Sequence, residues 1–323
     1  MKNYKLSICI PTYNRKEMLE VLLKSILIQI DDSIEIAISD NCSTDGTTEM
    51  IQNYMSLHTN IVYHYNNENY GADKNYLKSI EIASGTYCWL MGSDDTLQSD
   101  AIKNILNAID MYKSEIIICN RIECSYNMKE IRQRTWLKET YKENTQFQYK
   151  DLGQYFKDSL SIGAVFSYLS SIIVKREEWN EIEDKDLFVG TAYSHVYILL
   201  RILLNEKNSL LYMPHYLVNC RGDNDSFTQE GMAKRIMLDI KGYVKLADSV
   251  FNDSYLKGLF LNILRKERPL MSLISLRRRT TNREWNEYQS WLVNANYNKV
   301  MLVLLKNKKI LDILYFFKKT PKL

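Results

Sequence analysis

The sequence predicts an α/β protein with a doubly wound, mainly parallel sheet and a basic, helical C-terminal appendage. Short apolar runs alternate with amphipathic stretches through the N-terminal third, as expected for strands that alternate with helices. Each apolar run ends in a polar, turn-rich loop. Residues 251–323 hold 15 Lys and Arg against 5 Asp and Glu, whereas the whole chain has a net charge of only +3. We therefore expect a domain at 1–250 and a basic α-helical region at 251–323.

Four apolar runs in the N-terminal third predict strands, at Leu6–Ile10, Ile34–Ser39, Ile61–Tyr65 and Tyr87–Met91. Helices are expected between them, from about Lys16 to Gln29, after the turn at 40–47, and up to about Ser84. Parallel strands joined by helices bring their carboxyl ends to one edge of the sheet, where open α/β sheets bind ligands. The polar loops that follow these strands therefore mark the expected site.

The fourth strand ends in two adjacent carboxylates, Asp94 and Asp95. Such a pair suits a hard divalent cation, Mg²⁺ or Mn²⁺, which binds few protein oxygens and shares its other ligands with a diphosphate. The pair therefore indicates chemistry on a nucleoside diphosphate. The alternative is that both acids only cap the helix that follows, because acids are favoured in a first turn.

Four motifs resemble those of the family 2 glycosyltransferases, an inverting, nucleotide-sugar-dependent class with the GT-A fold. They are Pro11-Thr12-Tyr13-Asn14-Arg15, Ser39-Asp40-Asn41 with Ser43-Thr44-Asp45-Gly46-Thr47, Asn69 with Gly71 and Asn75, and Ser93-Asp94-Asp95. The resemblance implies a nucleotide-binding half and an acceptor half within a catalytic domain. It also implies a donor site in which Pro11, Tyr13 and Arg15 border the nucleotide, Asp40 contacts its base, Asp45 lies in the same loop, and Asn75 lines the donor pocket.

The chain departs from this family pattern at two places. Gly92 stands where the family usually has the first acid of its metal motif, so the cation would depend more on diphosphate oxygens and water. The family commonly supplies its general base from a Glu-Asp pair at the start of a helix, and the expected helix Tyr193–Arg201 has Ser194-His195 there.

A neutral imidazole can take the proton of an attacking hydroxyl group, so His195 is the predicted general base. The alternative is that His195 is a partly buried helix residue. Asp184 and Asp186, just upstream, are the other candidate bases, or else a solvated acidic turn.

A strand and turn are expected at Leu210–Pro214 and Tyr216–Val218, leading to Arg221. The guanidinium of Arg221 can bind two oxygens of a diphosphate at once, unless it belongs to a polar surface loop. Asp223 or Asp225 could replace the missing carboxylate of the metal motif.

The Gly92 motif, the His195 helix and the Arg221 loop resemble most closely the abequosyltransferase-type branch, which adds a dideoxyhexose in bacterial O-antigen assembly. This implies a nucleotide-activated deoxysugar donor and an undecaprenyl-diphosphate-linked oligosaccharide acceptor. The pocket for such a sugar should be less polar than one for glucose, and four aromatic residues could line it or belong to the core: Tyr126, Trp136, Phe166 and Tyr168.

Two other functions remain open at this point. One is a polyprenyl-phosphate sugar synthase, which shares the N-terminal motifs, and the other is a catalytically silent nucleotide-sugar-binding protein, suggested by Gly92 and the missing Glu-Asp pair. An activity test of an enzyme in which His195 is replaced separates the first from the preferred mechanism, because a lipid phosphate needs no base.

Composition indicates where the enzyme works. The six cysteines lack the paired spacing of zinc sites, and neither a signal peptide nor a spanning apolar run is present, so we expect a cytoplasmic protein. The basic C-terminal region and its apolar end, Ile310–Lys319, suit docking on the inner face of the cytoplasmic membrane. A solvated basic face on packed helices is the alternative. No recognised nucleic-acid module accompanies these charges, so nucleic acid is not an expected partner.

Overall fold

The computed structural model describes residues 4–222, 231–307 and 311. These residues form two compact units. The first unit consists of residues up to 155 together with 163–222, and the second of 156–162 together with the described residues from 231 onward. The sequence analysis expects a boundary at residue 250, whereas the contacts divide these two units before residue 231. Helix α8 (Met232–Val250) belongs to the second unit because it packs on the helices that follow it.

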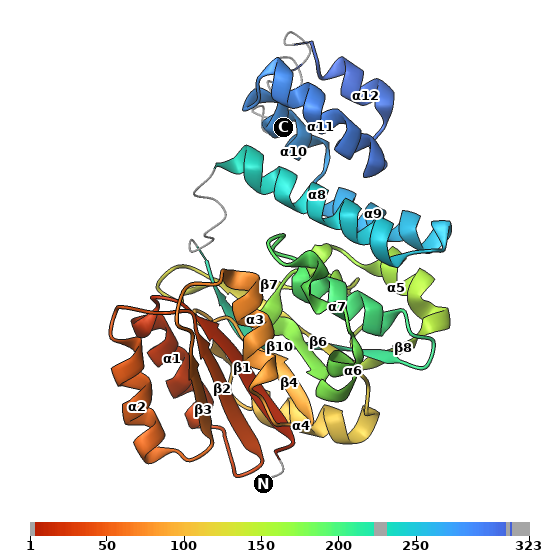
Figure 1. Ribbon diagram of the computed structural model, residues 1–323. Coiled ribbons are helices and arrows are strands. Elements are labelled where there is room, and N and C mark those ends of the chain that lie inside the picture. Colours follow the sequence, from red (N-terminus) through yellow and green to blue (C-terminus); the bar gives the residue numbers. More distant parts are fainter. Residues whose placement is uncertain (1–3, 223–230, 308–310, 312–323) are drawn as a thin grey trace. The chain divides into compact units, whose positions relative to one another are not determined.

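The first unit is built on one mixed sheet, in which β3, β2, β1 and β4 lie side by side (Figure 1). Within the described residues the main strand order is β3-β2-β1-β4-β9-β6-β10-β5. Its N-terminal half consists of four parallel strands, β1 (Leu6–Thr12), β2 (Ile34–Asp40), β3 (Ile61–Tyr65) and β4 (Tyr87–Leu90). These are the four strands that the apolar runs predict. Their carboxyl ends lie at one edge, so the polar loops that follow are neighbours in space.

The other half of the sheet is mixed. Its strands are β5 (Thr96–Leu97), β6 (Ile116–Cys124), β7 (Glu130–Arg134), β8 (Thr145–Gln148), β9 (Ile172–Lys175) and β10 (Ser209–Arg221). Strand β9 runs antiparallel between β4 and β6, while β6 and β10 are parallel. The two pieces expected around Pro214 form one strand, β10, whose register with β6 shifts between Met213 and Tyr216. Proline cannot donate to a ladder, which explains an irregularity at this point.

The helices of the first unit are α1 (Lys16–Leu27), α2 (Thr47–Leu57), α3 (Ala72–Glu81), α4 (Ala101–Tyr112), α6 (Arg176–Glu181) and α7 (Ser194–Leu203), and α5 (Leu152–Asp158) begins in this unit and ends in the second. Of these, α1, α2, α3 and α7 lie where the sequence predicts helices. In α1 the buried residues are Leu19, Leu22, Leu23 and Ile26, a spacing that gives one apolar face. Each such side chain contributes about 1.5–3 kcal/mol when fully buried.

The second unit is helical, as the sequence predicts for its C-terminal region. After α8 come α9 (Ser254–Glu267), α10 (Leu270–Arg278), α11 (Asn282–Asn294) and α12 (Lys299–Leu304). Asp239 is fully buried and pairs with Arg235 and Arg268, so this buried carboxylate has charged partners. None of the helices in the described residues has the length and apolar character needed to cross a bilayer.

Candidate active site

The loops that follow β1 and β2 are joined by side-chain hydrogen bonds. Asn14, in a left-handed conformation with φ 48°, accepts a hydrogen bond from Thr44 N (2.8 Å) and donates its own N–H to Ser43 Oγ (2.9 Å). Asp45 accepts from the backbone N–H groups of Lys16 (2.9 Å) and Thr47 (3.2 Å) at the first turns of α1 and α2. Burial alone would raise the pKa of Asp45, but these bonds and one from the Thr47 hydroxyl lower it. The Asp45 carboxylate therefore links the first turns of α1 and α2.

Asp40, the predicted base contact, is fully buried at the end of β2. Its Oδ1 accepts from Ser43 N (2.8 Å) and its Oδ2 from the Tyr63 hydroxyl (2.8 Å). Burial, together with this carboxylate, raises the pKa of Tyr63, so the hydroxyl keeps its proton and donates it. Both oxygens of Asp40 thus have partners within the fold.

Asn75 of α3 is also buried, at 3% exposure. Its Oδ1 accepts from Ser39 Oγ (2.7 Å) and its Nδ2 donates to the Thr12 carbonyl (3.1 Å), which ties the ends of β1 and β2 to α3. Of the residues predicted around the nucleotide, Pro11 is half-buried, and the Tyr13 ring and the Arg15 guanidinium are the more accessible groups. The buried Asp40 and Asn75 thus fix the loops that carry the more accessible Tyr13 and Arg15.

The acid pair lies beside two arginines. Arg15 forms an ion pair with Asp94, with 3.0 Å between Nη1 and Oδ2. Arg221, at the end of β10, donates its Nε–H to the Asp94 carbonyl (2.8 Å) and its backbone N–H to Asp95 Oδ1 (3.0 Å). The structure thus brings together Arg15, which follows β1, the acid pair, which follows β4, and Arg221 at the end of β10. Their roles as nucleotide, cation and diphosphate ligands stay predictions.

Asp95 is the more enclosed acid of the pair, at 4% exposure. Its Oδ2 accepts hydrogen bonds from the hydroxyl groups of Tyr168 (2.6 Å) and Ser170. Burial, and then the charge of Asp94, raises the pKa of Asp95 to about 6. Neither acid caps a helix, because β5 follows them and α4 begins only at Ala101, so that alternative is wrong.

Two carboxylates fit a cation that takes its remaining ligands from phosphate oxygens and water. Within the part of the chain that the structure describes, no group of three or more His, Cys, Asp or Glu side chains is placed to hold a metal by itself. Asp223 and Asp225, which could add a carboxylate, lie outside the described residues.

Arg121, which the sequence analysis did not single out, forms the inner wall of the site. Its guanidinium lies 4.1 Å from the Tyr168 ring centroid and 5.1 Å from that of Trp136, and it pairs with Glu123 at 2.8 Å. Of the four aromatic residues expected around the sugar, Trp136 and Phe166 are buried, Tyr168 contacts Asp95, and Tyr126 is 48% exposed. Tyr126 lies over Arg221, with 5.8 Å from its ring centroid to the guanidinium carbon.

His195, the predicted general base, is 3% exposed in the first turn of α7. Its Nε2 lies 3.0 Å from the Phe166 carbonyl, and its buried Nδ1 has no hydrogen-bond partner among the described residues. Burial lowers its pKa to about 4, against the opposing effects of Asp73 and the Phe166 carbonyl. Its ring meets the Tyr76 ring edge-on at 6.0 Å. The imidazole is therefore neutral, but enclosed.

The other candidate bases lie on the surface. Asp184 accepts hydrogen bonds from the Tyr197 hydroxyl (2.6 Å) and from Arg201 Nη1 (3.3 Å). The Tyr197 bond is the main cause that lowers the pKa of Asp184. Asp186 is exposed in the same short turn, so this segment matches the solvated acidic turn that the sequence analysis left as the alternative.

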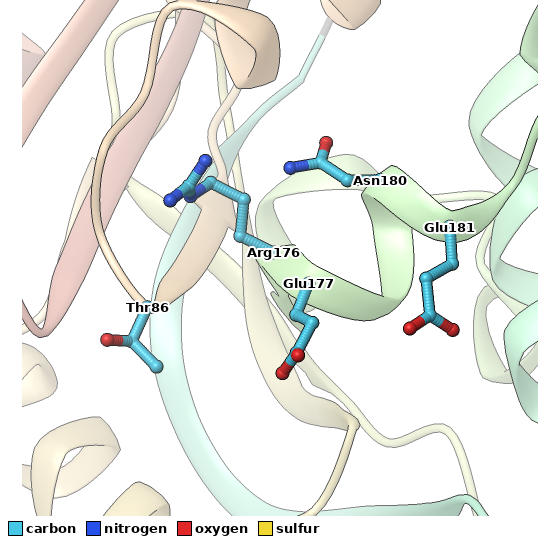
Figure 2. A pocket seen from close by; sticks show the side chains of 5 residues that line it. All are labelled: Thr86, Arg176, Glu177, Asn180 and Glu181. Carbon is cyan, nitrogen blue, oxygen red and sulfur yellow. The ribbon is translucent and has the colours of Figure 1, made fainter.

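A separate cavity of 520 Å³ is lined by Thr86, Arg176, Glu177, Asn180 and Glu181 (Figure 2). Thr86 directly precedes β4 and Arg176 follows β9, which is antiparallel to β4, so this cavity lies at the amino end of β4. The Arg176 Nε–H is bound to the Gly85 carbonyl at 2.7 Å. The cavity is therefore distinct from the acid pair at the carboxyl edge.

Comparisons with known proteins agree with this geometry. Residues 7–173 match the family model "Glycosyl transferase family 2". The chain is 44% identical to abequosyltransferase RfbV of Salmonella typhimurium over 273 residues, which cover 82% of this chain and 81% of that protein.

Solved structures confirm the expected GT-A fold. Staphylococcus aureus TarS 1–349 in complex with UDP-GlcNAc superposes with a TM-score of 0.68 at 14% identity, covering 98% of this chain and 93% of that one. The mannosyltransferase PcManGT of Pyrobaculum calidifontis, in complex with GDP-Man and Mn²⁺, superposes with a TM-score of 0.56 at 13% identity, covering 98% and 88%. The chain thus belongs to glycosyl transferase family 2.

Proposed function

We propose that this protein transfers a deoxy- or dideoxyhexose from a nucleotide sugar to a hydroxyl group of a lipid-linked oligosaccharide, during assembly of O-antigen or a related surface polysaccharide. The observation that supports the proposal is that Asp94 and Asp95 contact Arg15 and Arg221 at the carboxyl edge of the sheet. The choice of sugar is supported by the 44% identity to an enzyme named as an abequosyltransferase.

The charges at this edge suit a diphosphate leaving group. Arg15 and Arg221 supply positive charge beside the acids, and a guanidinium can bind two phosphate oxygens at once. Asp94 and Asp95 would hold Mg²⁺ or Mn²⁺, which, when bound, neutralises the charge that develops on the diphosphate. The acceptor oxygen bonds to the anomeric carbon as the bond to the diphosphate breaks, so the products are a glycoside, a nucleoside diphosphate and a proton.

Release of nucleoside diphosphate tests this function. UDP-, GDP-, CDP- and dTDP-sugars are offered with and without Mn²⁺ and with a lipid-linked oligosaccharide, and the product's anomeric configuration is read by NMR to test inversion. We expect release from one donor, abolished in Asp94→Asn/Asp95→Asn and unchanged in the control Asp100→Asn, an exposed acid. Release that survives the double substitution would contradict the proposed site.

The same assay separates the other two functions. A polyprenyl-phosphate sugar synthase would release nucleotide with a polyprenyl phosphate as acceptor and would not need an oligosaccharide. A catalytically silent binding protein would bind one donor, as measured by calorimetry, and release nothing with any acceptor.

We also propose that the second unit docks on an anionic membrane surface, where a lipid-linked acceptor lies. Helix α12 exposes Val300 (69%), Val303 (62%) and Leu304 (49%), which share one face because they are three and four residues apart. Lys299 and Lys306 lie at the two ends of this apolar face. Apolar faces with basic flanks favour the interface of anionic bilayers. Most of the apolar end predicted for this role, Ile310–Lys319, lies outside the described residues.

Flotation with vesicles that contain phosphatidylglycerol tests the docking. We expect Val300→Ser/Val303→Ser to weaken binding, whereas the control Val21→Ser, on a half-exposed position of α1, leaves it unchanged. Equal flotation of the double variant and the wild type would contradict the role of α12.

A further inference from the structure

The segment 163–171, between α5 and β9, forms the wall behind Asp95 and is held at several points. Ser170 Oγ accepts from Gly92 N (2.9 Å) and donates to Asp95, and the Ser170 carbonyl accepts from Trp89 Nε1 (2.8 Å). Tyr168 donates to the same Asp95 oxygen. This segment therefore sets where the buried carboxylate of Asp95 points.

Phe166 is the strained point of this segment. Its φ is 71°, in the left-handed region, although it is not a glycine, and its side chain is fully buried. A backbone of this kind costs about 1–3 kcal/mol and persists only where surrounding contacts enforce it. Contacts that fix the conformation of Phe166 therefore also fix the position of the segment 163–171 behind Asp95.

His195 supplies the side-chain contact to this strained backbone. A carbonyl oxygen can only accept, so the Nε2 that lies 3.0 Å from it must carry the proton. A neutral ring then has its lone pair on Nδ1, which is buried and has no hydrogen-bond partner in the part of the chain that the structure describes. The basic nitrogen is thus enclosed, while the protonated nitrogen has a structural bond.

The ring itself is fixed by its neighbours. Asp73 accepts from the N–H groups of Gly190 (2.7 Å) and Ala192 (3.0 Å) and from the Ser194 hydroxyl (3.0 Å), which fixes the segment leading into α7. Tyr76, also on α3, packs edge-on against the imidazole. The donor on His195 is therefore held rigidly against Phe166.

We propose that His195 is a positioning residue: its Nε2–H holds the left-handed Phe166 and, through the segment 163–171, keeps Tyr168 and Ser170 on Asp95. This proposal rests on the proposed function only in the claim that Asp95 takes part in sugar transfer. It differs from the general-base role in what the side chain must supply, because positioning needs an N–H donor and a base needs a lone pair within reach of the acceptor.

Glutamine separates the two roles, since its amide offers an N–H near the position of Nε2 and has no basic nitrogen. We compare His195→Gln, His195→Ala and the control His215→Gln, at an exposed histidine on β10. Positioning predicts that His195→Ala lowers kcat/KM by about 10–100-fold, as changes behind a ligand do, and that His195→Gln recovers to within about fivefold of the wild type. A general base predicts a loss of about 10²–10⁴-fold in both variants.

Hydrogen exchange of the segment 163–171 gives a second readout that needs no turnover. Losing one hydrogen bond worth about 1–1.5 kcal/mol should speed exchange there by roughly tenfold in His195→Ala, with little change in His195→Gln or His215→Gln. Wild-type exchange in His195→Ala, or a His195→Gln enzyme as inactive as His195→Ala, would overturn the proposal. If the wild type transfers no sugar, the proposed function fails, and the exchange comparison still decides the role of His195.

Discussion

Replacing Gly92 by aspartate restores the acid that the family usually has, and we predict that it destabilises the metal-free protein. A Cβ at this position would lie 3.1 Å from Asp94 Oδ1, 3.2 Å from Asp95 Oδ2 and 3.4 Å from Ser170 Oγ. A carboxylate there would join two others, and unit charges about 4 Å apart repel by about 4 kcal/mol at an effective dielectric constant of about 20. Arg15 offsets part of this repulsion, because it already lies 3.0 Å from Asp94.

The matched control is Gly92→Asn, which has the same shape without the charge, so both variants share the steric cost. We expect Gly92→Asp to be less stable than Gly92→Asn by about 2–4 kcal/mol, or roughly 5–10 °C in Tm. Circular dichroism melts in EDTA at low salt measure this difference, and Mn²⁺ with a nucleoside diphosphate should reduce it. Equal Tm values for the two variants in EDTA would refute the argument that a carboxylate at position 92 is repelled by those of Asp94 and Asp95.

Three further predictions follow from neighbouring contacts. Gly163→Ala should destabilise by at least about 1–3 kcal/mol in thermal melts, because its Cβ would lie 2.1 Å from the Trp136 ring, whereas Gly258→Ala, with open space around it, should not. Arg221→Lys should raise the donor KM by roughly tenfold, since lysine loses the forked geometry. The pKa of His195 is about 4 in the folded protein and about 6.5 in the unfolded chain, so the unfolded chain binds a proton first as the pH falls from about 6.5 to 4, and the folded protein loses stability. Over that pH range, the free energy of unfolding of His195→Gln, measured in melts, should fall by about 3 kcal/mol less than that of the wild type.

The parallel half of the sheet could be predicted because its signals are local. Each of its strands is an apolar run that ends in turn residues, and β3 lies where the pattern places it, at Ile61–Tyr65. Strand β9 was missed, because a four-residue strand gives a weak pattern and its pairing with β4 joins residues more than eighty positions apart. Pairing at that distance depends on tertiary packing, which no short window of sequence contains.

The closeness of Asp94, Asp95 and Arg221 could be predicted from residue type and position, since strand ends of one sheet must meet at one edge, whereas Arg15 was placed there by the family resemblance. The roles of Asp45 and Asn75 were harder, because short Asx side chains bind loop backbone as readily as they bind a ligand. Their partners, Lys16 N and the Thr12 carbonyl, come from other segments. Ser170 gave no signal, since a serine becomes a partner of Asp95 only through the course of the segment that carries it.

If Asp94 and Asp95 hold the cation and Arg15 binds the donor as proposed, the ion pair between Arg15 and Asp94 would link donor binding to cation binding. Arg15 neutralises Asp94 in the absence of a ligand, so a cation that binds alone must compete with the guanidinium. A diphosphate attracts Arg15 more strongly than one carboxylate does, because it offers more charge and a forked contact. An Arg15 bound to the phosphate would leave Asp94 free to hold the cation with Asp95, and the same phosphate would supply oxygens that two acids alone do not provide. Donor and cation would then strengthen each other's binding by the same factor.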